Sequence, residues 1–566
     1  MDSHIGELER ETQNRIIQLF KDKDKLGYTY LGNYHYREGN SHIEKELLRR
    51  FLIDKQHYPL MEANKAIDIF TRAALCTPDS MYDANKDVYS LLRYGVNISP
   101  EIGSTKKTLK LIDWEHPFDN DFYIAEEVTI KGVDETSSEK RPDLLIYVNG
   151  IAMADIELKR STMSVHNGIR QNIDSQKKEF IRPFFSTMQL LCAGNNTEGL
   201  WYGVIDTPEK FWLRWKESNP EVSNELDRST LQLFNKERFL EFIHDFMIYD
   251  GGIKKACRPN QYFAVKAAQP RVRKKDSGII WEAQGSGKSL IMVWLAQWIH
   301  ENVNDARVVI ITDREELDAQ IEDNFKNAGE TIKRAKSGED LITTLNDANP
   351  WLICSLIHKF GNKDMADGGE TYGKKTPIPM KKYLEDIVAK LPEGFKAKGD
   401  LYVFVDECHR TQDGYLHEAM LKIMGDDVML IGFTGTPLLK SDKKTSFETF
   451  GSYIHTYKFN EAVEDHVILD LRYEARNVPQ YLGNKDKIDK WFDNKTRGLN
   501  PSAAADLKRR WANMQNLFSS KERIDRIVAD ICTDFDEINA LNSGRGNAML
   551  VADSIYQACR YWKALQ

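Results

Sequence analysis

The chain has 566 residues, of which 41% are hydrophobic and 29% are charged, and its formal net charge is −8. This length allows three or four domains with separate cores, and the composition is that of an ordinary globular protein. The negative net charge excludes a protein that grips nucleic acid with its whole surface, so any contact with DNA has to use local grooves.

The cysteines and the first residues indicate where the protein works. Seven cysteines are scattered along the chain without a Cys-x-x-Cys pair, which argues against a structural zinc site or a disulfide framework and favours a reducing cytoplasm. The segment from Met1 to Arg15 is polar and charged, unlike a signal peptide. No window approaches the ~20 apolar residues of a membrane span. We therefore expect a cytoplasmic protein.

A charged helix and a tyrosine-rich stretch are expected before residue 40, and an amphipathic helix follows them. Ser41 and Glu44 have the spacing of a capping box, in which the glutamate side chain bonds back to the residue that caps the helix. The alternative is that Glu44 faces a metal site. The sequence alone leaves both interpretations open.

Residues 141–159 read RPDLLIYVNGIAMADIELK and predict a hairpin, because two β-rich runs flank the turn pair Asn149-Gly150. The length of the loop sets the register of the two strands. If only Asn149 and Gly150 form the loop, Asp143 lies opposite Ile156 and Glu157 points to the other face.

A three-residue loop from Val148 to Gly150, with the glycine left-handed, gives a different pairing. Asp143 then lies opposite Asp155 and shares one face of the hairpin with Glu157 and Lys159. The apolar residues between these charged positions then face the other way and can pack inward. We prefer this register because it brings the charged side chains together.

Two carboxylates beside a lysine suit the metal-assisted hydrolysis of a phosphodiester. Asp143 and Glu157 would hold Mg²⁺, which polarises the scissile phosphate and lowers the pKa of a bound water. Lys159 would position that water or steady the developing charge. Asp155 is a competing metal ligand. A solvated hairpin face with alternating charges is the alternative, and the motor motifs further along the chain favour the nuclease.

Gln171 lies on the next predicted helix and is a candidate to support this site, although the pattern alone favours an exposed helix residue. Residues 195–199 form a turn cluster that is expected to close the core of the first domain. Residues 211–249 are expected to be a mostly helical connection.

The most specific motif of the chain is a phosphate-binding loop within residues 278–290, where an apolar strand is followed by a glycine loop and a helix. Lys288 would reach the β- and γ-phosphates of ATP, and Ser289 would bind Mg²⁺. Glu282 stands where the full Walker pattern has a glycine, and an ordinary strand-to-helix turn is the alternative. The residues expected to contact the nucleotide are Gly285, Ser286, Gly287, Lys288 and Ser289.

Gln261, upstream of this loop, can read the adenine edge through the donor and the acceptor of its amide. Downstream, residues 401–405 predict a buried parallel strand that ends in Asp406 and Glu407. Ligands gather at that end of an open α/β sheet. Asp406 is expected at the Mg²⁺, and Glu407 is expected to orient or deprotonate the attacking water.

Further buried runs alternate with helical patterns, as a doubly wound parallel sheet requires. Residues 430–433 are followed by Thr434 and Thr436, whose hydroxyls can sense the state of the phosphates. The strand of residues 307–312 is followed by Asp313 and Arg314, which are expected on the side where a DNA strand can lie. Residues 351–355 predict another strand, and the basic run 271–275 is expected to be a solvated loop.

After residue 459 the pattern becomes helical and charged, and residues 547–554 predict the first strand of a second motor lobe. We expect a nuclease domain in residues 1–250, a first motor lobe in 251–465, and linker helices with the start of a second lobe in 466–566. The sequence is therefore expected to be a fragment.

The order of these motifs resembles the restriction and motor (R) subunit of Type I restriction-modification enzymes. Pro142-Asp143 with Glu157-Leu158-Lys159 is similar to the nuclease motif of that family. The remaining motifs resemble those of superfamily 2 translocases, namely Arg258-Pro259-x-Gln261, the Gly285–Ser289 loop, Asp313-Arg314, Asp406-Glu407-Cys408-His409-Arg410 and Gly432-Phe433-Thr434-Gly435-Thr436-Pro437. The resemblance implies an α/β fold with a PD-(D/E)xK nuclease-like domain, a RecA-like motor lobe and the start of a second.

The resemblance also implies a function. An R subunit joins a methyltransferase (M) and a specificity (S) subunit, pumps duplex DNA with ATP, and cuts unmethylated DNA with Mg²⁺. The alternatives are a DNA-repair helicase-nuclease of superfamily 2 and a non-cleaving, ATP-gated DNA clamp. Gln171 is followed by Ser175 where the family has a tyrosine, and the motifs of the second lobe are absent. The fragment alone is therefore expected to hydrolyse ATP poorly and not to translocate.

Overall fold

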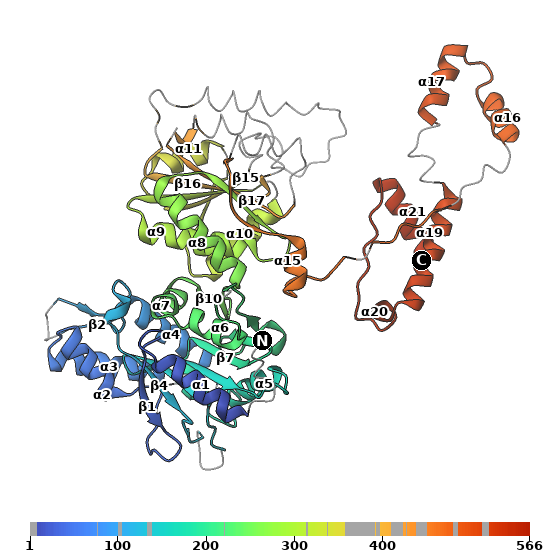
Figure 1. The fold of residues 1–566 in the computed structure, drawn as a ribbon. Helices are drawn as coiled ribbons and strands as arrows, with labels where there is room; N and C mark the ends of the chain where they lie inside the picture. Colours follow the sequence, from blue (N-terminus) through green and yellow to red (C-terminus); the bar gives the residue numbers. More distant parts are fainter. Residues whose placement is uncertain are drawn as a thin grey trace. The chain divides into compact units, whose positions relative to one another are not determined.

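The protein is described by a computed structural model, which divides the chain into two compact units, Met1–Leu469 and Asp470–Gln566. Figure 1 draws their elements. The expected nuclease domain and first motor lobe fall in the same unit and share one apolar core. The described residues are 8–75, 77, 79–99, 105–132, 138–219, 221–312, 315–336, 338–356, 391, 395, 397–408, 421, 423–425, 427–436, 450–471, 473–478, 485–511 and 520–566.

A seven-stranded mixed sheet, ordered β1-β4-β5-β6-β7-β8-β9, carries the predicted nuclease residues. β1 pairs with β4 and β6 with β7 in parallel, and the other neighbours are antiparallel. Every residue of β5, β6 and β7 is buried, so the alternative of a solvated hairpin face is wrong. The strands are β1 (Thr29–Asn33), β4 (Phe122–Glu126), β5 (Leu144–Val148), β6 (Ile151–Leu158), β7 (Leu190–Asn195), β8 (Gly199–Gly203) and β9 (Leu213–Arg214).

Helices with one apolar side surround this sheet. In α1, for example, Ile16, Ile17 and Phe20 are buried at helical spacing, and the helix packs on β1 and α6. The turn cluster 195–199 joins β7 to β8 as predicted. The helices are α1 (Glu9–Lys21), α2 (Lys45–Arg50), the π-helical η1 (Phe51–Lys55), α3 (Leu60–Ala74), α4 (Met81–Tyr94), α5 (His166–Ser175), α6 (Glu225–Leu233) and α7 (Lys236–Asp245), with short 3₁₀ turns at η2 (Pro117–Asp119), η3 (Arg182–Ser186) and η4 (Glu209–Phe211).

The turn of the β5–β6 hairpin has two residues. Asn149 and Gly150 have φ values of 52° and 87°, as the preferred hairpin turn requires, and Val148 pairs with Ile151. The three-residue loop that we predicted is therefore wrong. A side chain on Gly150 would also lie 2.7 Å from a backbone oxygen of the neighbouring helix start, so this position needs glycine.

A bulge farther along the hairpin restores the common face that we predicted. The register shifts between Ile146 and Tyr147, so that Leu144 pairs with Ile156. One residue farther, Asp143 stands across from Glu157. The predicted pairing of Asp143 with Asp155 is wrong, because the bulge shifts the register in the opposite direction from a three-residue loop, and Asp155 pairs with Leu145.

The second seven-stranded sheet is wholly parallel, in the order β14-β15-β13-β16-β17-β12-β18, and confirms the predicted parallel sheet and its buried strands. A parallel sheet needs cover on both faces, which explains its nearly continuous apolar runs. The strands are β12 (Gly278–Glu282), β13 (Ala306–Thr312), β14 (Lys333–Arg334), β15 (Leu352–Leu356), β16 (Asp400–Val405), β17 (Met429–Thr434) and β18 (Tyr453–Tyr457), and the helices are α8 (Pro259–Lys274), α9 (Lys288–Asn302), α10 (Glu315–Asn327), α11 (Gly338–Asn346) and α15 (Phe459–Glu464).

Two antiparallel pairs complete the first unit, β2 (Val96–Ile98) with β3 (Lys107–Leu109) and β10 (Met247–Asp250) with β11 (Ile253–Ala256). The predicted connection 211–249 contains α6 and α7, which bury large side chains in the shared core, so it is part of the core and not a spacer.

The second unit is helical in its described residues, around a small core of Ile524, Val528 and Tyr561. The strand that we predicted over residues 547–554 is wrong, because this segment is unpaired and leaves Met549 and Val551 exposed by 88% and 80%. The helices are α16 (Lys485–Lys495), α17 (Pro501–Trp511), α19 (Lys521–Glu537), α20 (Asn539–Asn542) and α21 (Ile555–Leu565).

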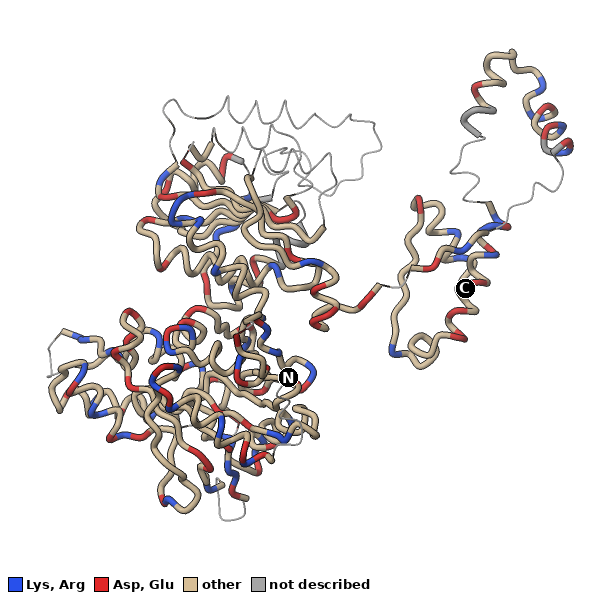
Figure 2. The backbone as a smooth tube through the Cα atoms, viewed as in Figure 1, with Lys and Arg blue, Asp and Glu red and all other residues tan. Residues whose placement is uncertain are grey.

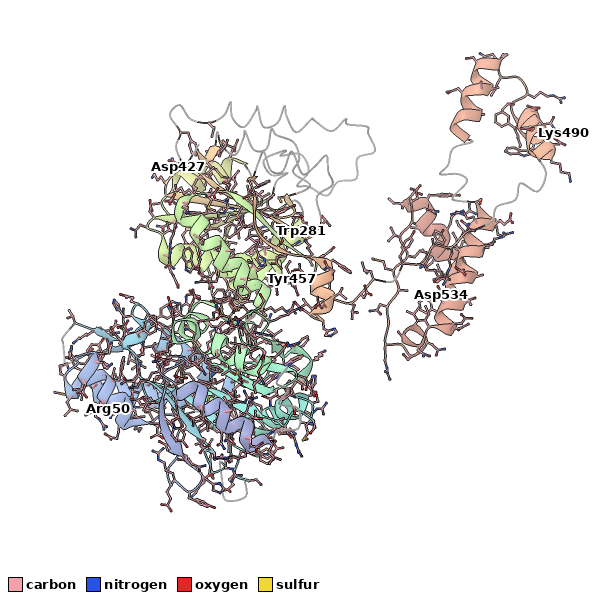
Figure 3. All side chains as sticks on the ribbon, viewed as in Figure 1. Arg50, Trp281, Asp427, Tyr457, Lys490 and Asp534 are labelled. Carbon is pink, nitrogen blue, oxygen red and sulfur yellow. The ribbon has the colours of Figure 1, made fainter. Side chains whose placement is uncertain are left out.

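Charged residues of both signs alternate along the described backbone (Figure 2). The basic run 271–275 is not the solvated loop that we expected, because it forms the last turn and the cap of α8. Lys275 pairs there with Asp400 and with Asp427, which is labelled in Figure 3. None of the helices in the described part of the chain combines the length and the apolarity that crossing a bilayer requires.

We predict that His42 makes the free energy of unfolding fall in acid. Its carbonyl accepts from Ala152 of β6, and burial lowers the pKa of its imidazole to about 4. The imidazole takes up a proton near pH 6.5 in the unfolded chain but only near pH 4 in the folded protein. Its contribution to the free energy of unfolding is therefore complete above pH 6.5 and is lost as the pH falls from 6.5 to 4. His42→Gln should reduce the fall in the free energy of unfolding between pH 7 and 4.5 by about 1–2 kcal/mol. Urea unfolding measures this.

The matched control for this prediction is His116→Gln, because the side chain of His116 is 69% exposed. The control should show the same pH dependence as the wild type. An unchanged fall in the His42→Gln protein would contradict the prediction.

Candidate functional site

The end of the β5–β6 hairpin holds the three predicted nuclease residues together. Asp143 accepts from the backbone N–H of Leu158 at 2.7 Å, and its carboxylate lies 3.9 Å from the Nζ atom of Lys159. Glu157 is in direct electrostatic contact with Asp143 and is 1% exposed. The register explains this, because the bulge puts the two carboxylates on one face of the sheet.

Helix α5 contributes two amides to this face. Gln171 donates from Nε2 to the Oε2 atom of Glu157 at 2.7 Å, so it lies at the site and not on an exposed helix surface. Asn172 donates to the Oδ2 atom of Asp155 at 2.7 Å. Asp155 shares the face of Glu157, is likewise 1% exposed, and is held by Asn172. Of the three carboxylates, Asp143 borders the open space, and Glu157 is held next to it by Gln171, which also lines that space.

That open space is a cavity of about 380 Å³. It receives side chains from the hairpin, from α5, from α1 and from the end of β4. Asp143, Lys159 and Gln171 were singled out from the sequence, whereas the other lining residues were not. The residues that line the cavity are Glu9, Arg10, Gln13, Glu127, Arg141, Asp143, Lys159 and Gln171.

The residues that sequence reasoning missed build one wall of the cavity. Gln13 donates to the backbone oxygen of Asp143 and to Glu127, both at 3.2 Å. Arg141 contacts Glu127 at 2.8 Å. Lys159 lies 3.3 Å from the Oε1 atom of Glu9. No local motif marks them, because helix α1 reaches the hairpin only through the fold.

Three buried carboxyl groups at this cavity or behind it have raised pKa values. Burial raises the pKa of Asp143 to about 6, against the opposing effect of Lys159. Burial, and next the charge of Asp143, raise the pKa of Glu157 well above its ordinary value. Burial likewise raises the pKa of Asp155 to about 7. A cation that neutralises these carboxylates would remove the cost, and hard carboxylate oxygens are the ligands that Mg²⁺ prefers.

Glu44 is not part of this cavity. Its two carboxylate oxygens accept from Arg37, both at 2.7 Å, and its N–H donates to the carbonyl of Gly150 at the turn. The turn is at the opposite end of β5 from Asp143. The predicted capping box is also wrong, because α2 begins at Lys45 and Ser41 accepts from the N–H of Ile43.

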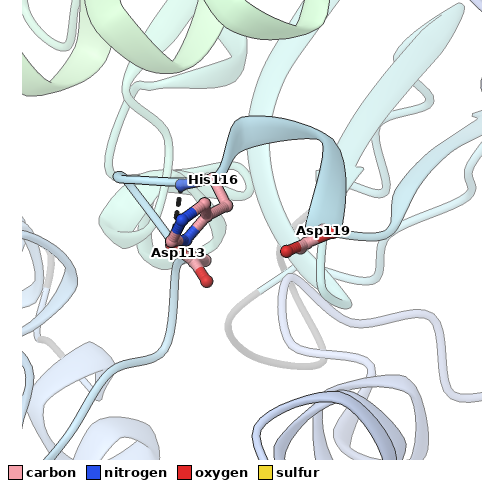
Figure 4. A group of neighbouring side chains, drawn as sticks. All are labelled: Asp113, His116 and Asp119. Atoms are coloured by element: carbon pink, nitrogen blue, oxygen red, sulfur yellow. Dashed lines mark hydrogen bonds and ion pairs between the residues drawn. The ribbon is translucent and has the colours of Figure 1, made fainter.

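Another group of potential metal ligands lies in the turn around η2 and stabilises it (Figure 4). Asp113, His116 and Asp119 lie close together there. Asp113 accepts from the N–H of His116 at 2.9 Å, and the N–H of Asp113 donates to Asn120. These bonds close a turn, and two of the three side chains are exposed.

The phosphate loop lies between β12 and α9, as predicted. Gly285 and Gly287 have φ values of 87° and 98°, so both positions favour glycine. Helix α9 begins at Lys288, and Ser289 is its second residue, partly exposed. Backbone N–H groups at the start of such a helix form an anion site.

Three predicted motor residues meet above this loop. Lys288 lies 3.0 Å from the Oε1 atom of Glu407. A side chain on Gly435 would come within 2.8 Å of the Nζ atom of Lys288. The strand ends of β16 and β17 therefore reach the loop, which is the arrangement that the sequence predicts for a nucleotide site.

The remaining motif residues take local roles. Asp406 directly follows β16 and accepts from the N–H of Glu407 at 3.0 Å. The hydroxyl of Thr434 hydrogen-bonds to the backbone of Thr436 across the turn after β17. Gln261 accepts from the N–H of Arg258 and donates to the carbonyl of Gly287 at 3.1 Å, so its amide holds the loop.

Some predicted residues lie outside the described part of the chain. These are Asp313, Arg314, His409, Arg410 and Pro437.

Comparison with known proteins supports both halves of this picture. Residues 7–210 match the family model of the type I restriction enzyme R protein N terminus, and residues 260–505 match that of the SWI2/SNF2 ATPase. A putative type I restriction enzyme endonuclease subunit, MjaIXP of Methanocaldococcus jannaschii, is 27% identical over 97% of this chain and 54% of its own length. The chain is therefore similar to the R subunits of type I restriction enzymes over its N-terminal part and to the SWI2/SNF2 ATPases farther along.

Other type I restriction enzyme endonuclease subunits match in the same way. The HindI endonuclease subunit of Haemophilus influenzae is 25% identical over 83% of this chain and 45% of its own length. The chain thus spans about half the length of the curated relatives it matches. A DNA complex of the Type ISP restriction-modification enzyme LlaGI shares 15% identity over 55% of this chain and 31% of its own, with a TM-score of 0.28.

Proposed function

We propose that this chain is the nuclease and motor part of a type I restriction enzyme. It would use ATP to move duplex DNA, cut unmethylated DNA with Mg²⁺, and act in the cytoplasm together with methyltransferase and specificity subunits. The observation that carries the proposal is the presence in one chain of two sites, the acid-lined cavity at the hairpin and the phosphate loop under Glu407.

The cavity residues suit phosphodiester hydrolysis. Asp143 and Glu157 would hold the metal ion, which when bound polarises the scissile phosphate and lowers the pKa of its water. Lys159 would steady the charge that develops on the phosphate, and its short distance to Asp143 keeps its ammonium group at the cavity. Gln171 fixes the orientation of Glu157.

The motor residues suit ATP hydrolysis. Lys288 would bind the β- and γ-phosphates, Ser289 and Asp406 would hold the Mg²⁺ of the nucleotide, and Glu407 would orient the attacking water. Glu407 has a φ of 48°, a conformation that is rare outside glycine, and such strain is often found at functional positions. Thr434, Thr436 and Arg314 are candidates to pass the nucleotide state onward.

A cleavage assay tests the proposal. The complete assembly, purified with its partner subunits, should cut unmethylated circular DNA that carries the target site when Mg²⁺ and ATP are present. Methylated DNA, EDTA or a non-hydrolysable ATP analogue should each reduce cutting by at least about 100-fold. Equal cutting without ATP would contradict the coupling of the two sites.

Co-purification separates this proposal from a repair helicase-nuclease. The native protein should bring down a methyltransferase and a specificity subunit. Purification of the active enzyme without either one would favour repair.

A further inference from the structure

A buried carboxylate lies directly beneath the phosphate loop. Glu282, the last residue of β12, is 0% exposed. Its Oε2 atom accepts from Asn260 of α8 at 2.8 Å and from the hydroxyl of Ser286 at 3.1 Å, and its Oε1 atom lies 3.0 Å from the Nδ1 atom of His455 on β18. Burial of a carboxylate is costly unless donors surround it, and here three elements supply them.

Helix α8 holds the same loop from its other side. Arg258 donates to the carbonyl of Ser286 at 3.3 Å, and Gln261 donates to the carbonyl of Gly287 at 3.1 Å. A side chain on Gly287 would lie 2.3 Å from the Nε2 atom of Gln261, so the approach is close. Peptide units that turn their carbonyls toward α8 turn the following N–H groups the other way, where phosphates would bind.

The edge strand β18 completes the support. Glu282 pairs with Tyr457 in the register, and the N–H of Ala283 donates to the carbonyl of Tyr457 at 2.9 Å. The hydroxyl of Tyr457 donates to Asp465 at 2.9 Å. Glu282 is therefore the point where α8, the loop and β18 are joined through side chains.

We propose that Glu282 is a positioning residue for nucleotide binding. It fixes the Ser286 side chain and with it the backbone of the loop, so that the amides point to the phosphates before the nucleotide arrives. This inference rests on the proposed ATP site. Because Glu282 lies under the loop and contacts no reacting atom, its loss should weaken nucleotide binding more than it slows the turnover of bound nucleotide.

The test uses Glu282→Gln in the full-length subunit within its assembly. An uncharged amide cannot accept from all three donors, so the Kd for a fluorescent ATP analogue and the KM for ATP should rise about tenfold, whereas kcat should change less than about twofold. Ser286→Ala should cause a smaller rise. The double variant should bind no worse than Glu282→Gln alone, because both changes remove the same bond.

Two further variants make the outcome decisive. Glu241 is another partly buried acid that contacts α8, where its carboxylate accepts from the hydroxyl of Tyr262 at 2.8 Å, but it does not contact the loop. Glu241→Gln should therefore leave the Kd unchanged. Lys288→Ala should abolish nucleotide binding. An unchanged Kd in Glu282→Gln, with binding lost in Lys288→Ala, would overturn this inference alone. Retained binding in Lys288→Ala would overturn the ATP site itself.

Additive effects of Glu282→Gln and Ser286→Ala would also overturn the inference, because they would show that the two side chains act separately. Glu282→Asp keeps the charge on a shorter side chain and should give an intermediate Kd. A loss of folded protein in Glu282→Gln would instead lower the apparent kcat and leave the KM of the remaining folded enzyme unchanged.

Discussion

Glu157→Gln should abolish DNA cleavage and leave ATP turnover intact. The substitution keeps the size of the side chain and its bond to Gln171, but it removes a negative charge from the pair with Asp143. A metal site that loses one of two carboxylates loses most of its affinity, so the cleavage rate should fall by at least about 100-fold. Linearisation of circular DNA and phosphate release measure the two activities.

Glu44→Gln is the matched control for this prediction. It alters a carboxylate beside the same hairpin but at the turn, where Glu44 pairs with Arg37. The control should cut DNA at the wild-type rate. Cleavage retained in Glu157→Gln would reject the nuclease assignment, and cleavage lost in the control would show that the whole hairpin is simply fragile.

Lys288→Ala should stop both activities. The ammonium group lies between Glu407 and Gly435, where the phosphates of a nucleotide on the loop would meet it. ATP turnover should fall by at least about 100-fold, and cleavage should fall with it if cutting needs prior translocation. Steady-state ATPase and cleavage assays with the assembled enzyme measure this.

The control for Lys288→Ala is Lys326→Ala, since Lys326 is an exposed residue of α10 that pairs with Glu322 in its own helix. Its ATPase and cleavage rates should match those of the wild type. Cleavage that persists after ATP turnover has stopped would separate the nuclease from the motor.

The motor lobe could be predicted almost entirely from the sequence. Its strands are continuous apolar runs that end in polar residues, and the parallel order brings those ends to one edge of the sheet. The sequence pattern was therefore enough to predict that Lys288 lies next to Glu407. Glu282 could be noticed only as a departure from the glycine of the motif, since its donors come from α8 and β18, which are far apart in the chain.

The nuclease cavity was predictable only in part. The common face of Asp143 and Glu157 was predicted, but the reason differed, because a bulge cannot be seen in a pattern of alternating residues. Gln171 looked like a surface residue, because its contact depends on how α5 lies on β6. Glu9 and Gln13 come from more than 100 residues away and carry no motif.

Two local interpretations failed for a common reason. The capping box at Ser41 and Glu44 and the strand over residues 547–554 both rested on a short pattern. In the fold, Arg37 engages Glu44 and the helix starts later. The apolar run near Met549 finds no partner strand among the described residues, and an apolar run without a partner does not form a strand.

The most direct test of the account is to measure ATP hydrolysis and DNA cleavage side by side for the wild type, Glu157→Gln and Lys288→Ala in the same assembly. We expect the wild type to have both activities, Glu157→Gln to have only ATP hydrolysis, and Lys288→Ala to have neither. Cleavage by either variant at the wild-type rate would contradict the claim that one chain unites a metal-dependent nuclease with the motor that drives it.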